Sequence, residues 1–175
     1  MPPCSAKDPS RDFPRTWARL TEEARQELRR VCNDPDDLPG LLQSRAARYG
    51  LPEFLPQMAE LEGAVSACRR HGPDVAKYPS DLGLNPSLSL VQLSWKGLTE
   101  LVAPEGEPAA GSGDWEPVRE ETTILLWWDP FQRRVRLEAA SSEDLLALKM
   151  VAEEMDAREL AMEHGLQPSF LYTLQ

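Results

Sequence analysis

Thr122-Thr123-Ile124-Leu125-Leu126-Trp127-Trp128 is an uncharged run of β-branched, aliphatic and aromatic residues. Asp129-Pro130-Phe131-Gln132 follows, with the residue types of a turn. In the next stretch, Arg133-Arg134-Val135-Arg136-Leu137, arginine alternates with apolar residues. Such residues suit the two faces of a strand. Together the three stretches predict a β-hairpin, with Val135 and Leu137 directed inward.

Helices are predicted after the hairpin. Ser141 or Ser142 is a candidate N-cap for the first one. Its apolar residues at helical spacing are Leu145, Leu148, Val151 and Met155. Residues 156–175 then have the spacing of a helix-turn-helix, in which Ala packs at the crossing and Gly makes the turn. That pattern comprises Glu159-Leu160-Ala161, Gly165-Leu166, Pro168-Ser169, Leu171 and Leu174.

Upstream of the hairpin, the sequence predicts a flexible arm and a helical domain. Residues 1–15 are rich in Pro and charge and form the arm, and residues 16–84 form the domain. Its first helix starts at Thr16 or Thr21 and buries Trp17, Leu20, Ala24, Leu28 and Val31. The second spans residues 38–49, with Asp36 or Asp37 as the cap and Gly50 at its end. The third runs from near Pro52 to His71.

Residues 85–175 are predicted to form a second, small α+β domain. It begins with a strand over residues 88–95, whose side chains alternate, and contains an exposed loop over residues 103–117. The predicted fold class is therefore α+β, with a helical bundle followed by a winged-helix-like hairpin and helix-turn-helix.

The charge balance makes nucleic acid a disfavoured partner. The 175 residues include 29 Asp and Glu against 19 Lys and Arg, a net charge of −10, which repels phosphate. Residues 141–175 hold two basic and seven acidic residues, and residues 167–175 hold no Lys or Arg. DNA binding through the helix-turn-helix, as a transcriptional regulator, therefore stays the alternative to protein binding.

The sequence favours a cytoplasmic protein that does not enter a membrane. The longest apolar run covers residues 124–128, far too short to cross a bilayer, and the N-terminus has no apolar signal segment. Cys4, Cys32 and Cys68 are far apart and odd in number, which predicts reduced thiols.

No pattern in the sequence predicts catalysis, a metal or a cofactor. The phosphate-binding, dinucleotide-binding and serine-nucleophile motifs are absent from the sequence. His71 and His164 lie at predicted helix ends, where they suit the helix dipole. Glu159 and Glu163 share a helix but lack further ligands. We therefore expect a binding protein rather than an enzyme.

Aromatic and basic residues near the hairpin are the candidate partner-binding residues. Adjacent tryptophans in a strand send one ring inward and the other outward, where it can join an aromatic patch. The arginines form a short basic group that suits either a solvated strand face or an acidic peptide. The candidate residues are Trp95, Trp115, Trp127, Trp128, Arg133, Arg134 and Arg136.

The order of several short segments resembles the HvfC-type family, whose members are often described as DNA-binding proteins. Those segments are Leu51-Pro52-Glu53-Phe54-Leu55, Met58-Ala59-Glu60-Leu61-Glu62, Asn85-Pro86-Ser87-Leu88-Ser89-Leu90-Val91-Gln92-Leu93-Ser94-Trp95, Thr123-Ile124-Leu125-Leu126-Trp127-Trp128-Asp129-Pro130 and Arg134-Val135-Arg136-Leu137-Glu138. The resemblance covers residues 51–160. It implies a non-catalytic partner of a multinuclear non-heme iron oxidase, holding the precursor peptide that the oxidase modifies. The iron and the chemistry would belong to the oxidase.

The hairpin and the resemblance lead to one functional hypothesis. We expect an adaptor that binds a protein or peptide, with an extended peptide adding to the sheet beside residues 122–128 or 133–138.

Overall fold

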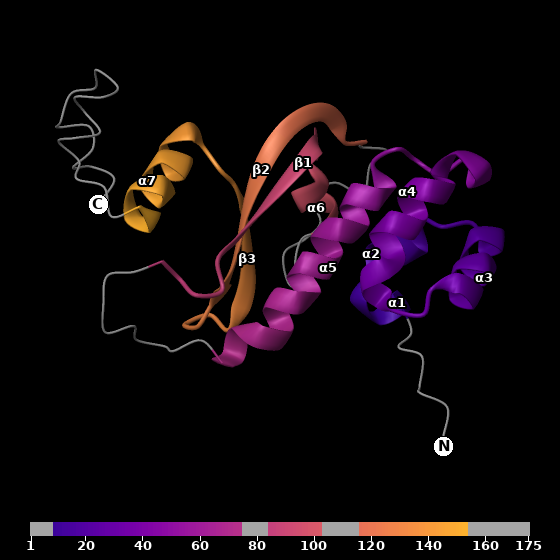
Figure 1. Ribbon diagram of the computed structural model, residues 1–175, viewed down its shortest axis with the longest axis horizontal. Helices are drawn as coiled ribbons and strands as arrows, with labels where there is room; N and C mark the ends of the chain where they lie inside the picture. Colours follow the sequence, from indigo (N-terminus) through magenta and orange to yellow (C-terminus); the bar gives the residue numbers. More distant parts are fainter. Residues whose placement is uncertain (1–8, 75–83, 103–115, 154–175) are drawn as a thin grey trace.

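The protein is a three-stranded antiparallel sheet between two helices, with a helical bundle beyond one of them (Figure 1). The computed structural model describes residues 9–74, 84–102 and 116–153. The helices are α1 Pro9–Asp12, α2 Pro14–Ala18, α3 Glu22–Val31, α4 Leu38–Tyr49, α5 Leu55–His71, α6 Leu98–Val102 and α7 Ser142–Ala152. Short 3-10 turns are η1 Pro35–Asp37 and η2 Gly72–Asp74, and the strands are β1 Ser89–Lys96, β2 Val118–Asp129 and β3 Arg134–Ala139. The α+β class is thus confirmed.

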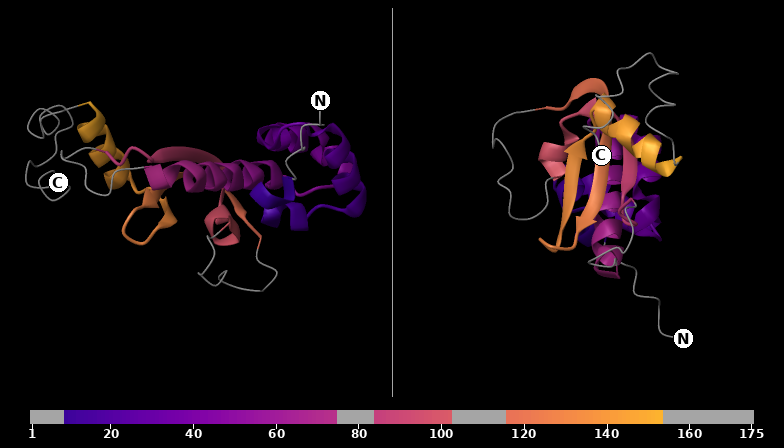
Figure 2. Two further views of the ribbon diagram at one scale, coloured as in Figure 1. Left: turned by 90° about the horizontal axis from the view of Figure 1, so that it is seen from below. Right: turned by 90° about the vertical axis from the view of Figure 1, so that its left-hand side faces the viewer.

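The hairpin formed by β2 and β3 is confirmed, and β1 joins it on the other side. The sheet order is β1-β2-β3, so β2 is the central strand. Ile124, Leu126 and Trp128 alternate on the face that α5 covers, while Leu125 and Trp127 lie on the opposite face. Figure 1 shows α5 on one side of the sheet and α7 on the other, and Figure 2 shows α7 across only part of its face.

The helical part of the chain begins within the segment that was predicted to be a flexible arm. Residues 1–15 are the predicted arm, yet α1 begins at Pro9 and α2 at Pro14. Phe13 between them is almost completely buried against the bundle, where Gly63 leaves space for its ring. The burial of this one aromatic side chain fixes the start of the folded chain.

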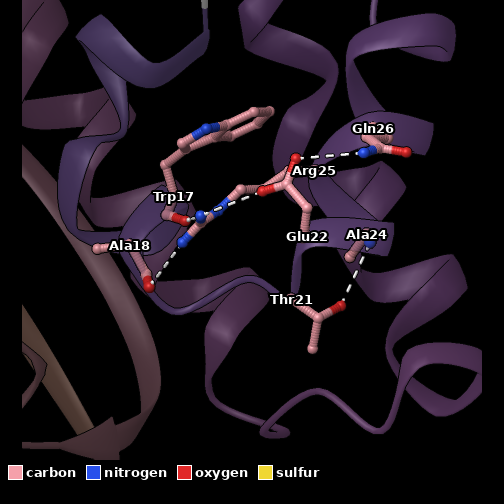
Figure 3. Close-up of polar contacts among 7 residues, drawn as sticks. All are labelled: Trp17, Ala18, Thr21, Glu22, Ala24, Arg25 and Gln26. Carbon is pink, nitrogen blue, oxygen red and sulfur yellow. Dashed lines mark hydrogen bonds and ion pairs between the residues drawn. The ribbon is translucent and has the colours of Figure 1, made fainter.

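The single helix predicted across Trp17 and Val31 is in fact two helices, α2 and α3. Thr21 caps α3, because its side-chain oxygen accepts from the Ala24 N–H at 3.2 Å. Arg25 holds the corner by donating to the carbonyl oxygens of Trp17 and Ala18, each at 3.0 Å (Figure 3). The apolar spacing was compatible with one helix, but the Thr21 cap and the Arg25 bridge define a corner.

The boundaries of α4 are confirmed, and Asp37, one of the two predicted caps, is its N-cap residue but makes no side-chain capping hydrogen bond. Gly50 ends the helix in the left-handed region, at φ 58°, as expected of a C-terminal glycine. Neither Asp36 nor Asp37 caps α4 through its side chain. Instead the Asp34 carboxylate accepts from the Asp36 N–H at 3.2 Å and caps η1, because the chain makes a 3-10 turn before α4.

The core is continuous between the bundle and the sheet. It includes Phe13 and Leu42 of the helical part and Leu126 and Val135 of the sheet, with α5 between them. The predicted division at residues 84 and 85 therefore marks a change from helix to strand and not a break in the core. In the ranges that the structure describes, no helix is both long and apolar enough to cross a membrane.

The turn after α5 approaches the sheet closely. A Cβ placed on Gly72 would lie 2.4 Å from Trp128, a distance that atoms cannot occupy. We therefore expect Gly72→Ala to lower the free energy of unfolding by about 2 kcal/mol, the cost of forced repacking in a filled core. Denaturant titration followed by tryptophan fluorescence measures the change. Gly40→Ala is the matched control, because no atom lies within 4 Å of its Cβ and alanine favours the helix.

A buried carboxylate on α5 holds the start of α2. Glu62 is 4% exposed and accepts from the N–H groups of Arg15 at 2.9 Å and Thr16 at 2.8 Å. Replacing it with leucine leaves both donors unpaired, so we expect Glu62→Leu to lower the free energy of unfolding by about 2–4 kcal/mol. Glu60→Leu, exposed on the same helix, is the control and changes the stability by less than about 0.5 kcal/mol.

Candidate functional site

The three predicted tryptophans that the structure describes, Trp95, Trp127 and Trp128, lie in different surroundings. Trp128 is buried beneath η2, and Trp127 lies half-buried on the opposite face of the sheet. Trp95 packs edge-on against Phe54, with ring centroids 6.1 Å apart, and lies near Arg119. Trp115 lies outside the described residues.

The hairpin arginines differ in role. Arg133 occupies the left-handed region at φ 53° and ends the turn, with its side chain exposed. Arg136 sits opposite Trp127, and its Nε lies 3.6 Å from Oδ2 of Asp129. Arg134 is half-buried and pairs in register with Asp129. Arg134 and Arg136 therefore belong to the sheet face that carries Trp127.

Asp129 organises the turn of the hairpin. Its Oδ1 accepts from the N–H groups of Phe131 and Gln132, each at 2.9 Å. The hydrogen bond from the Gln132 N–H is the largest cause that lowers the pKa of Asp129 below its ordinary value of 3.8. Desolvation opposes it, but the hydrogen bonds from Phe131 and Arg136 and the positive charge of Arg136 add to the lowering, so the net direction is downward.

The turn should therefore loosen only in acid. Because the folded pKa of Asp129 is depressed, its stabilising effect is complete above the unfolded value and is lost as the pH falls through the folded value. We expect the amide resonances of Phe131 and Gln132 to shift below pH ~3.8 in an NMR titration. Asp129→Asn should abolish this shift, whereas Glu138→Gln on the adjacent strand should leave it. A shift that survives Asp129→Asn contradicts the assignment.

One predicted peptide-binding edge does not exist. Residues 122–128 belong to β2, which pairs with β1 on one side and with β3 on the other. The expectation that a peptide adds beside residues 122–128 is therefore wrong, because the sequence did not show that β1 joins the hairpin. The outer strands of this sheet are β1 and β3.

The outward groups of β1 follow from the hydrogen-bond alternation of the sheet. The Ala140 N–H donates to the Thr123 carbonyl at 2.8 Å, so Thr123 directs its main chain toward β3. Main-chain groups of successive residues point to opposite sides. Ile124 therefore points to its β1 partner Val91. The residues on either side of Val91, Leu90 and Gln92, must then point their N–H and C=O groups away from the sheet.

Ser94, the next outward residue of β1, already has a partner. Its N–H donates to Oε1 of Gln57 on α5 at 2.7 Å, and the Gln57 amide donates back to the Ser94 hydroxyl at 3.3 Å. Within the described ranges, Leu90 and Gln92 make no comparable hydrogen bond with any other element. The open part of the edge is therefore short and ends at Gln57.

An apolar groove lies between this edge and α7. We call it the β1–α7 groove; it has a volume of about 330 Å³. Its lining residues are Leu84, Asn85, Leu88, Ser89, Leu90, Leu145, Leu148, Lys149 and Ala152. Leu84, Leu90 and Leu145 are 39%, 54% and 37% exposed, an unusual density of open leucines at one place.

Both walls of the groove are fixed by polar contacts at their ends. The Asn85 amide donates to the Trp128 carbonyl at 3.1 Å, and the Trp128 N–H donates to the Ser87 hydroxyl at 2.9 Å. On the other wall, Ser141 and Asp144 form a capping box at the start of α7. Met150 on α7 is buried, so the helix is anchored to the protein.

A polar hollow of about 680 Å³ adjoins the groove at Leu145. The hollow lies beside a β-bulge between β1 and β2. Arg119 and Thr122 on β2 are three residues apart, whereas their partners on β1, Trp95 and Leu93, are two residues apart, so β2 has one extra residue here. Its charged lining residues are Lys96, Glu120 and Glu121. We call it the bulge hollow.

Neither a cysteine nor a histidine is among the described residues that line the groove and the hollow. Cys32 and Cys68 are buried, and burial raises the pKa of both thiols, which makes them poor nucleophiles. In the described ranges, no three His, Cys, Asp or Glu residues lie together as metal ligands would. Glu159, Glu163 and the helix-turn-helix predicted for residues 156–175 lie outside those ranges.

The sequence analysis missed the residues that form this site, above all Leu90, Gln92 and Leu145. One signal was available, because residues 88–93 carry apolar side chains at both even and odd positions. A strand of that kind has apolar residues on both faces. The Gln57 contact had no such signal, since it joins residues 37 apart in the sequence.

Compared with known protein families and with characterised proteins, the chain matches neither a family model nor a characterised protein. The resemblance to the HvfC-type family therefore stays a hypothesis, and the function has to be argued from the site.

Proposed function

We propose that this protein is a non-catalytic adaptor that binds an extended segment of another protein along β1. The proposal rests on the outward-pointing main chain of two residues of β1: Leu90, which lines the β1–α7 groove, and Gln92, which lines the adjoining bulge hollow. Main-chain hydrogen bonds at a strand edge supply affinity for any extended segment, and a neighbouring pocket selects its side chains.

The geometry favours an extended segment over a helix. An added strand lies about 4.8 Å outside β1, and every second side chain of that strand points to the sheet face on which α7 lies. Leu90 on β1 and Leu145 on α7 both line the groove beside that path. A bound segment with apolar residues at alternate positions would cover leucines that now face solvent.

The resemblance suggests which segment this is. In an HvfC-type complex, it would be part of the precursor peptide, presented to an iron-dependent oxidase. The groove is compatible with that role, since an adaptor needs an affinity for the peptide and no reacting group of its own.

A proline at Gln92 tests the edge directly. Because the Gln92 N–H points away from the sheet, Gln92→Pro keeps the β1–β2 ladder but blocks an added strand. We expect it to weaken the binding of peptides selected from a random display library at least about tenfold, measured by fluorescence anisotropy. Circular dichroism checks that the variant is folded. Unchanged affinity in the folded variant contradicts the proposal.

Leu90→Asp tests the apolar wall in the same assay. A charge in the groove should again weaken binding at least about tenfold, because the bound side chain would then face a carboxylate. Val118→Asp is the matched control, because Val118 is 59% exposed but lines neither the groove nor the bulge hollow. Equal losses in the two variants would show that the effect is not specific to the site.

A further inference from the structure

The bulge hollow has an unbalanced negative charge. Nζ of Lys96 lies 2.9 Å from Oε1 of Glu120, so these two charges neutralise each other. Glu121 is exposed and has no ion-pair partner among the described residues. The Glu121 carboxylate is therefore unpaired among the described residues, and it lies in the hollow rather than in the groove that Leu84 and Leu90 line.

The bulge explains why two glutamates meet at this point. An extra residue in one strand interrupts the alternation of side chains and redirects them. Here Glu120 and Glu121 together stand opposite the single residue Ser94. Glu120 is held by Lys96, which leaves Glu121 available to a ligand.

The Gln57 contact determines where a ligand would meet this charge. Strand addition ends at Gln92, because the Ser94 N–H already donates to Gln57. A residue of the ligand just beyond the last main-chain pair lies beside the bulge hollow. The distance between an added strand and β2 is two strand spacings, roughly 10 Å. A lysine or arginine side chain on the added strand can reach across this distance to the Glu121 side chain on β2.

We propose that the bound segment has two chemical parts: apolar side chains at alternate positions for the β1–α7 groove, and a lysine or arginine beyond them for Glu121. This inference rests on the proposed function and adds the charge and order of the ligand. Opposite charges across an interface contribute mainly to specificity and to the rate of association.

A second copy of this protein does not match that description. If two copies paired antiparallel through β1 about a two-fold axis, the residues placed beyond Gln92 would be those before Leu90 in the other copy, because Lys96 lies at the opposite end of β1. Residues 84–89 carry no charge and so offer no cation at the required end. The ligand that fits is a segment of another polypeptide with a basic residue next to alternating apolar ones.

A random peptide display library, selected separately on the wild type and on Glu121→Lys, tests the inference. The wild type should enrich lysine or arginine at a fixed offset from two alternating apolar positions. Glu121→Lys should enrich aspartate or glutamate at the same offset. Glu60→Lys is the charge-matched control; it lies exposed on α5 and should select the same peptides as the wild type.

Affinities of the selected peptides give a second readout. Replacing the enriched basic residue with alanine should weaken binding to the wild type roughly two- to fivefold, an effect that salt reduces. The same replacement should have no such effect on binding to Glu121→Lys.

The outcomes separate the two proposals. Peptides that require Leu90 and Gln92 but show no charge preference overturn this inference and leave the proposed function standing. A library that yields no binder sensitive to Gln92→Pro overturns both. A wild-type dimer in light scattering that Leu90→Asp dissociates also overturns both, because the groove would then hold a second copy.

Discussion

The fold depends on α5 being buried over half of its circumference. Its residues Leu55, Met58, Leu61 and Val65 face the core, which extends to the bundle on one side and to the sheet on the other. A helix in this position cannot be strictly amphipathic, since two neighbours need apolar contacts. The close approach of Gly72 to Trp128 then fixes how far the end of the helix lies from the central strand.

Local features of this fold could be predicted because they depend on residues that are close together in the sequence. The hairpin follows from the alternation around Asp129, and the end of α4 follows from Gly50. Relations between distant residues could not be predicted in this way. The pairing of β1 with β2, and hence the error about the free edge, depends on partners more than 20 residues apart, which no local pattern specifies.

The same distinction explains the outcome for the candidate site. The predicted partner-binding residues are tryptophans and arginines because these residue types contribute much of the binding energy in many protein interfaces. The structure uses Trp128 in the core and Asp129 and Arg136 to shape the turn. Residue type alone therefore did not show which of these side chains are structural, and their part in binding stays a prediction. The open leucines acquire significance only because α7 stands opposite them.

The hydrogen bonding along the β1 edge supports the proposal that this edge binds a peptide segment. Proteins protect exposed strand edges because unpaired main-chain groups invite aggregation. Here the Ser94 N–H donates to the side-chain oxygen of Gln57, so it is not available to another strand. The β-bulge interrupts the pairing between β1 and β2 at the same position. In residues 9–74, 84–102 and 116–153, a side chain covers the main chain at Ser94, whereas none hydrogen-bonds the main chain of Gln92 or Leu90. The Gln57 contact thus limits how many residues of β1 can pair with an added strand. A limited number of pairing residues suits the recognition of one short segment, and the apolar groove beside them can select its side chains.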